Sequence, residues 1–357
     1  MSSEKIHQVR KGRGATFSPD NRYASLTREA LDDGWGLHDE PAPLLKTTLT
    51  RDASRSVIAY NDSPDVGFDR SINPYRGCEH GCIYCFARPT HAWLGLSPGL
   101  DFESRLSYKP DAAELLQQEL SHPGYRCAPI AVGINTDAYQ PVERRLALTR
   151  SILEVLVKAQ HPFTIVTKSA LIERDIDLIA AAARRRQASV AVSITTLDRT
   201  LSRRMEPRAA APQRRLGVIQ RLTEAGIPVS VLVAPVIPVL TDHQLETVLQ
   251  QAHRAGARHA GYVLLRLPHE VKDLFEDWLA HHEPLKARHV LSKVKDTRGG
   301  KLYNAQFGTR MRGTGDYAEM IKKRFELTVK RLGFTAWASL DSEHFTPPRT
   351  DRQLSLF

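Results

Sequence analysis

The chain has 357 residues, of which 41% are hydrophobic and 25% are charged, so it is long enough for one large globular domain with extensions or for two small ones. Lysine and arginine total 50 against 40 aspartates and glutamates, and the formal net charge of +10 permits a polyanionic partner. The sequence contains no apolar run of about 18 residues for a membrane span, no apolar signal segment and too few cysteines for a secreted disulfide framework, so we expect a cytoplasmic protein with no membrane partner.

Residues 1–67 predict a polar and partly disordered N-terminal extension, because no periodic apolar pattern precedes Val57. Within it, residues 10–14 predict a basic and flexible segment. We expect the core to cover residues 68–285 and to open with a short strand that ends at Asn73. A C-terminal helical segment over 286–340, with an amphipathic helix at 317–332, and a tail over 341–357 are expected to follow.

Three of the four cysteines, Cys78, Cys82 and Cys85, follow the first expected strand in a Cys-x3-Cys-x2-Cys array. Thiolates are soft ligands for soft metals. Three of them fill three corners of a [4Fe–4S] cluster and leave one iron open, whereas a closed electron-transfer cluster uses four cysteines. A structural zinc site that adds His80 or His91 is an alternative, as is a redox role for Cys82 and Cys85 alone.

The rest of the core alternates between two patterns. Helical patterns cover residues 111–120, 142–159, 171–186, 212–225, 241–255 and 270–282. Short β-branched runs lie between them at 129–134, 163–167, 189–194, 228–233 and 261–265. Such alternation predicts parallel strands joined by right-handed crossovers. We therefore expect an α/β fold, an incomplete (β/α)6 TIM-like barrel, with a doubly wound open sheet as the alternative.

Polar side chains follow the ends of several expected strands. Thr136 and Asp137 come after the second strand, Lys168 after the third, Ser193 at the end of the fourth and Arg266 after the sixth. Reactive groups gather at the carboxyl ends of the strands in a parallel barrel. These side chains and the cysteine loop therefore predict one site at that rim.

The cysteine array, with the aromatic Tyr84 before Cys85, resembles the Cys-x3-Cys-x-aromatic-Cys signature of the radical S-adenosylmethionine (SAM) superfamily. Residues 163–169, 193–207 and 231–235 are similar to segments of its spore photoproduct lyase-like branch. The resemblance implies a [4Fe–4S] cluster on the three cysteines and SAM at the open iron. It also implies reductive cleavage of SAM to a 5′-deoxyadenosyl radical, which abstracts hydrogen from a substrate.

The resemblance also implies contacts with SAM. Lys168 would pair with the methionyl carboxylate, and Ser193 would form a hydrogen bond with the ribose or the amino acid end. The other expected contacts surround the adenine and the amino group of the cofactor: Tyr84, Thr136, Asp137 and Ala234.

The substrate stays open at this point. The lyase branch carries a hydrogen-donor cysteine after the second strand, but residues 133–137 contain no thiol, and Cys127 before that strand is interpreted as buried and inert. The likeness and the charge suggest DNA or RNA; a protein or a small molecule is the alternative. We expect an electron donor such as flavodoxin or ferredoxin. The competing class is a non-catalytic nucleic-acid-binding protein with a structural Fe–S or zinc site, whose phosphate contacts would be the basic runs at 184–186, 203–204, 214–215 and 322–324.

Overall fold

The computed structural model of the chain describes residues 9–23, 44–337 and 339–348. Within these ranges, no helix combines the length and apolarity that a membrane span requires. Residues 1–8 and 24–43 of the expected N-terminal extension lie outside the described ranges, so the prediction of partial disorder is not tested there. Residues 349–357 of the expected tail also lie outside them.

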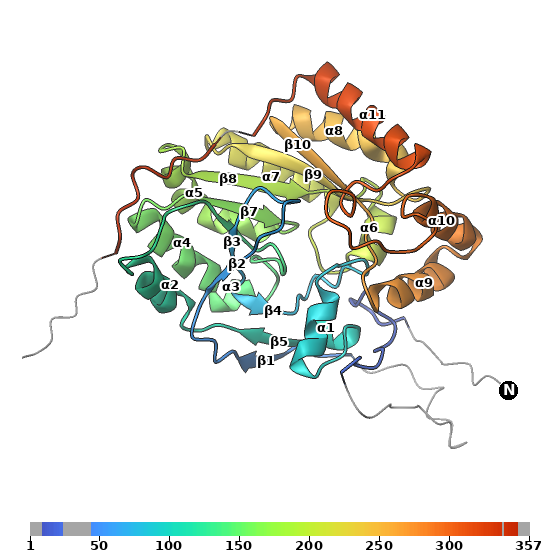
Figure 1. The fold of residues 1–357 in the computed structure, drawn as a ribbon, viewed down its shortest axis with the longest axis horizontal. Coiled ribbons are helices and arrows are strands. Elements are labelled where there is room, and N and C mark those ends of the chain that lie inside the picture. Colours follow the sequence, from blue (N-terminus) through green and yellow to red (C-terminus); the bar gives the residue numbers. More distant parts are fainter. Residues whose placement is uncertain (1–8, 24–43, 338, 349–357) are drawn as a thin grey trace, which may run out of the picture.

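In the described part of the chain, seven strands form one unclosed sheet in the order β10–β9–β8–β7–β6–β3–β2 (Figure 1). Six of them run parallel, and β2 (Ile58–Tyr60) pairs antiparallel with β3 at one edge. The parallel strands are β3 (Arg70–Ile72), β6 (Ile130–Val132), β7 (Phe163–Thr167), β8 (Ala188–Ser193), β9 (Val229–Val236) and β10 (His259–Leu264). This arrangement confirms the expected incomplete barrel.

The centre of the sheet shows why these runs become strands. Val132 of β6 lies opposite Ile165 of β7, which lies opposite Val190 of β8, and all three side chains are fully buried. Branched side chains pack well on a pleated surface that is covered on both sides. The connecting helices supply the cover (Figure 1): α2 (Ala112–Leu120), α4 (Leu148–Lys158), α5 (Ile176–Ala183), α7 (Pro212–Glu224) and α8 (Leu245–Arg254).

Three predicted helices differ from their expected forms. The helix expected at 142–159 is divided into α3 (Glu143–Leu146) and α4, because Ala147 adopts a left-handed conformation with φ 53°. The Glu143 carboxylate accepts a hydrogen bond from the Thr149 amide at this break. The helices expected at 171–186 and 241–255 begin with the 3₁₀ turns η2 (Ala170–Asp175) and η3 (Asp242–Gln244).

Several elements around the cysteine loop were not predicted. A small sheet in the described residues has the order β1–β5–β4, and its strands are β1 (Thr48–Arg51), β4 (Tyr75–Arg76) and β5 (Arg105–Tyr108). The helical additions are η1 (Arg88–Leu94), α1 (Leu100–Ser104) and α6 (Arg199–Met205), whereas α10 (Pro284–Asp296) falls within the expected C-terminal helical segment. Most of these pieces are too short to show a hydrophobic period, and β1 pairs with a strand more than fifty residues away in sequence.

The C-terminal part of the described chain contains the helices α9 (Val271–His282), α10 and α11 (Asp316–Leu332). Helix α9 buries Phe275 and Trp278 in a second apolar cluster near the cysteine loop. Helix α11 packs along α8 (Figure 1) and inserts Phe325 against Tyr262 of β10, with ring centroids 4.7 Å apart. Its basic residues face outward, where Arg324 pairs with Glu246.

Candidate active site at the carboxyl ends of the strands

The three clustered cysteines lie on the loop between β4 and η1, directly after the first parallel strand. Cys78 and Cys82 are buried, and Cys85 is partly buried. Burial raises the pKa of all three thiols, and at Cys78 the neighbouring Asp137 and the other two cysteines raise it further. Three adjacent thiols in such a place become thiolates only beside a strong positive charge, such as a bound metal.

Hydrogen bonds from outside the loop hold its backbone in place. The Cys78 amide donates to Phe102 O at 2.8 Å. The Gln140 side chain accepts from the Glu79 amide at 2.8 Å and donates to Gly77 O at 3.1 Å. Buried backbone groups of an irregular loop need such partners, and the loop is therefore preformed.

The N-terminal segment forms part of this support. The buried carboxylate of Glu103 accepts hydrogen bonds from the amides of Gly14 and Ala15, both at 2.9 Å, and pairs with the fully buried Arg88. Arg88 in turn donates to Cys82 O at 2.9 Å and to Gly81 O at 3.1 Å. Residues 13–16 are buried, and two of them, Arg13 and Gly14, belong to the segment that we expected to be flexible.

Four of the predicted SAM contacts come together beside the cysteine loop. The Lys168 ammonium donates to Ser193 Oγ at 2.5 Å and to Ala234 O at 3.1 Å, and it lies 5.9 Å from the centroid of the Tyr84 ring. These residues come from the loop after β7, from β8, from β9 and from the cysteine loop. The shared sheet edge brings them into one group, which we call the lysine group.

The other two predicted contacts lie on the loop after β6. Asp137 accepts a hydrogen bond from the Lys168 amide at 2.7 Å and lies 3.3 Å from Nδ1 of His80. Burial raises the pKa of Asp137, but His80 and several hydrogen bonds outweigh this effect and leave the pKa below its ordinary value. The Thr136 hydroxyl donates to Tyr75 O at 2.7 Å. Asp137 therefore joins the cysteine loop to the lysine group, while the Thr136 hydroxyl is directed to the backbone.

A buried carboxylate that the sequence analysis did not single out lies behind the lysine group. Glu206 accepts from the Tyr84 hydroxyl and from Thr195 Oγ1, pairs with the buried Arg215, and lies 3.8 Å from the Lys168 ammonium. Burial raises the pKa of Glu206, but Arg215 and Lys168 outweigh it and lower the pKa to about 2. Glu206 lies within residues 193–207, which resemble a segment of the lyase-like branch, but no local pattern marks it as a buried ion.

The histidines of the zinc alternative have other partners. Nε2 of His91 lies 2.9 Å from Arg105 O, and its ring packs edge-on against Phe102. His80 faces Asp137. In the described part of the chain, no three His, Cys, Asp or Glu side chains converge on one metal-ion position. A [4Fe–4S] cluster binds each thiolate to a different iron and does not need such convergence, so the donor set suits a cluster better than zinc.

The basic runs 214–215 and 322–324 of the competing interpretation contain arginines that pair with carboxylates. Arg214 pairs with Glu173, Arg324 with Glu246, and Arg215 is buried against Glu206. Their guanidinium groups are therefore already neutralised by carboxylates, which weakens their assignment as phosphate contacts.

Comparisons with known proteins agree with this geometry. The sequence profile of the Radical SAM superfamily matches residues 72–252. An uncharacterized protein of Mycobacterium tuberculosis is 42% identical over 231 residues, which cover 63% of this chain and 68% of that protein. An uncharacterized protein of Methanocaldococcus jannaschii is 29% identical over 171 residues, 48% of this chain and 61% of that protein.

Among solved structures, spore photoproduct lyase matches with a TM-score of 0.57 and 15% sequence identity, covering 80% of this chain and 79% of the lyase. At this identity the match shows a shared fold. The profile match, which covers more than half of the chain, establishes that the chain belongs to the radical SAM superfamily and is a radical SAM enzyme, with a [4Fe–4S] cluster and S-adenosylmethionine as its cofactors.

Proposed function

We propose that Cys78, Cys82 and Cys85 bind the [4Fe–4S] cluster and that the lysine group binds SAM next to it. The observation that carries this proposal is the convergence of Lys168 and Ser193 with the cysteine loop, since separate parallel strands and one irregular loop supply them. When bound, the reduced cluster supplies the electron that cleaves SAM to methionine and the 5′-deoxyadenosyl radical, which abstracts hydrogen from a substrate.

The donor set fits the cluster. Three buried thiols with raised pKa values need a positive partner, and cluster irons provide one. Three thiolates leave one iron without a protein ligand, the arrangement that a chelating cofactor requires.

The lysine group is preorganised for a carboxylate. Ser193 Oγ and Ala234 O fix the position of the Lys168 ammonium, and Glu206 lies 3.8 Å away. Lysine presents a point charge that pairs with a methionyl carboxylate. The Tyr84 ring, held by its hydroxyl against Thr195 at 3.0 Å, provides an apolar face near the adenine. We assign Asp137 and Thr136 to the loop that faces the amino group of SAM.

The proposed substrate class is DNA or RNA. Spore photoproduct lyase has been solved in complex with a dinucleoside spore photoproduct, and this chain carries a net charge of +10. Residues 133–137, which follow β6, contain no thiol that could donate a hydrogen atom. The proposed reaction therefore differs from one in which a cysteine on this loop donates hydrogen. Flavodoxin or ferredoxin is the proposed class of electron donor.

Anaerobic reconstitution with iron and sulfide tests the cysteine assignment. We expect Cys78→Ala, Cys82→Ala or Cys85→Ala to remove nearly all visible absorption and bound iron. Each variant should also fail to form 5′-deoxyadenosine from SAM when dithionite is the reductant. Cys127→Ala is the matched control, because Cys127 lies near Arg70 and Asp341, away from the loop. Loss of iron in the Cys127 variant, or its retention in the other three, would contradict the assignment.

Lys168→Ala tests the SAM site separately. The variant should keep its iron but bind SAM about tenfold or more weakly, because a charge-assisted hydrogen bond is lost. Lys158→Ala, at an exposed position on α4, is the control. Unchanged affinity in the Lys168 variant would reject the proposed contact. Deuterium transfer between labelled oligonucleotides and 5′-deoxyadenosine would test the substrate class.

A further inference from the structure

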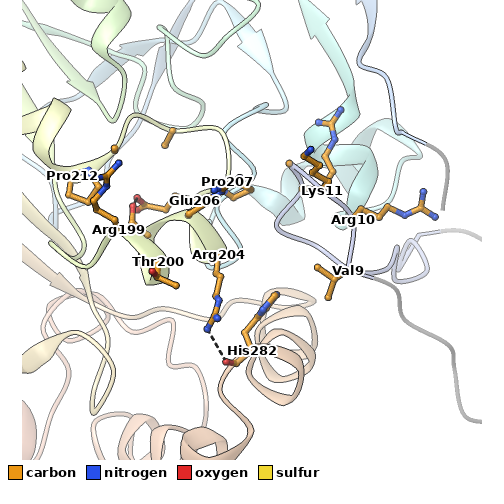
Figure 2. A pocket seen from close by; sticks show the side chains of 16 residues that line it. Val9, Arg10, Lys11, Arg199, Thr200, Arg204, Glu206, Pro207, Pro212 and His282 are labelled. Atoms are coloured by element: carbon orange, nitrogen blue, oxygen red, sulfur yellow. Dashed lines mark hydrogen bonds between the residues drawn. The ribbon is translucent and has the colours of Figure 1, made fainter. Parts of the chain in front are cut away.

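A cavity of about 920 Å³ lies beside the cysteine loop, between the N-terminal segment and α6 (Figure 2). In this view Arg10 and Lys11 lie on one side of the cavity, and Arg199 and Arg204 of α6 lie on the other. We call it the cationic groove. The lysine and arginine residues that line it are Arg10, Lys11, Arg13, Arg199, Arg203 and Arg204.

Part of the positive charge of the groove is not compensated by carboxylates. Among the described residues, Lys11, Arg199 and Arg203 are exposed and have no carboxylate within 4 Å. Arg204 reaches Glu283 at 3.5 Å. Glu206, the one carboxylate among the described residues that line the groove, is buried and already neutralised by Arg215. A concave surface with this excess concentrates positive potential and attracts an anionic partner.

Both walls of the groove are in direct contact with the cysteine loop. On one wall, the backbone of Gly14 packs so closely on Gly81 that a Cβ at position 14 would lie 1.9 Å from the Gly81 oxygen. On the other, the Ile83 amide donates to Met205 O at 3.0 Å. A partner in the groove is therefore separated from the thiol-bearing loop by about one layer of polypeptide.

The residues of the lysine group are not among the described residues that line the groove. The Glu206 carboxylate is directed to Tyr84, Thr195 and Arg215, while its residue forms part of the groove lining. A substrate held in the groove would therefore lie behind this buried ion cluster, separated from the proposed SAM contacts. The same position suits a partner that only has to deliver an electron.

We propose that the cationic groove is the docking surface for an acidic one-electron carrier protein of the flavodoxin or ferredoxin kind. The inference rests on the proposed function, because each reductive cleavage of SAM consumes one electron. The carrier's flavin or iron–sulfur centre loses one electron and the oxidised cluster gains it, and no covalent bond forms or breaks in this step. Charge complementarity selects the partner and speeds its association.

Equilibrium binding tests the proposal without turnover. The probe is an oxidised flavodoxin, whose flavin fluorescence reports its binding to the full-length reconstituted chain. We expect Lys11→Glu/Arg203→Glu to weaken binding about tenfold or more, and wild-type affinity to fall as salt rises from about 50 mM to about 300 mM. The control, Lys323→Glu/Lys330→Glu, makes the same charge change at exposed positions of α11 and should leave affinity within about twofold.

A second readout separates docking from chemistry. The groove variant should form 5′-deoxyadenosine at the wild-type rate with dithionite but more slowly with reduced flavodoxin. Equal flavodoxin affinity in wild type and groove variant would overturn the proposal, as would a groove variant that loses affinity for a single-stranded oligonucleotide while keeping that for flavodoxin. Failure of wild type to cleave SAM with dithionite would instead refute the proposed function, and the binding result would still decide the docking surface.

Discussion

At the level of single residues, two glycines that are far apart in sequence pack against each other beside the cysteine array. Gly14 rests on the carbonyl of Gly81, which lies between the first and second cysteines of the array, and the Gly14 amide donates to Glu103. Gly81 itself has a φ of 65°, a conformation that glycine adopts without strain. Neither glycine tolerates a side chain here, so the N-terminal segment and the cysteine loop are matched surfaces.

Gly14→Ala should detach this segment from the loop. Its methyl group overlaps the Gly81 oxygen, and displacement would break the hydrogen bonds to Glu103, with a loss of roughly 2 kcal/mol or more. Urea unfolding and iron content after reconstitution measure the effect. Gly67→Ala is the control, because no atom lies within 4 Å of the position that a Cβ would take there. Equal stability and iron content in both variants would show that the contact is dispensable.

His161 carries a pH dependence that is separate from the active site. The side chain is fully buried, its Nδ1 lies 2.9 Å from Pro162 O and its Nε2 lies 2.7 Å from the Tyr125 hydroxyl. Burial lowers the pKa of His161 from 6.5 to about 4, and the positive charge of Arg70 also lowers it. The imidazole is therefore neutral in the folded protein at every pH above that value.

This shift predicts a loss of stability in acid. Below pH 6.5 the unfolded chain binds a proton at His161 that the folded chain does not bind until about pH 4, so stability falls as the pH falls through this window. The full effect is roughly 3 kcal/mol. Urea unfolding of the wild type and of His161→Gln at several pH values checks it, because the variant lacks the titrating group. Parallel pH profiles for the two proteins would contradict this account.

At the level of elements, α11 shows how an amphipathic pattern becomes a packed helix. Ile321 and Phe325 face the core, while the exposed Leu327 lies on the outer side. The helix begins after Gly315, and Gly333, with a φ of 74°, ends it in a left-handed conformation. The apolar stripe predicted from the sequence is the face that docks on α8 and β10.

Truncation of a side chain should destabilise the protein on the buried face of α11 and have little effect on its exposed face. Ile321→Ala leaves a cavity under the helix and should cost roughly 3 kcal/mol of unfolding free energy. Leu327→Ala, on the solvent side, should change stability by less than about 0.5 kcal/mol. Thermal or urea unfolding distinguishes the two. Similar losses in both variants would mean that α11 is not anchored through its apolar face.

At the level of the whole molecule, two loops bridge the two ends of the open sheet. The loop after β2 supplies Asp65, which accepts a hydrogen bond from the Gly308 amide at 2.7 Å and pairs with Arg310. The chain around Arg310 is tied to β10, because the Leu264 amide donates to Met311 O at 2.9 Å. Among the described residues no strand closes the barrel, and this bridge spans the gap between its edges.

Arg310→Gln should loosen the bridge without unfolding the sheet. Amide hydrogen exchange in residues 61–67 and 306–311 should become several-fold faster, because local opening of these loops no longer requires an ion pair to break. Exchange in the central strands β7 and β8 should stay the same. Lys293→Gln, which removes an exposed pair with Asp296 on α10, is the control. No change in the loop amides would show that the pair does not hold the two edges together.

The six parallel strands, most of their helices and the three clustered cysteines could be predicted from the sequence alone. Strand and helix periods are local properties, and the spacing of Cys78, Cys82 and Cys85 lies within eight residues. The prediction that Lys168 and Ser193 meet also followed from the rule that the carboxyl ends of parallel strands share one edge.

Only the tertiary structure decided the rest. The docking of Gly14 on Gly81, the hydrogen bond from Tyr84 to the buried Glu206 and the bridge from Asp65 to Arg310 join residues that no local pattern relates. The physical reason is that such contacts depend on close packing and on charges paired across loops, which exist only when distant segments are folded against one another.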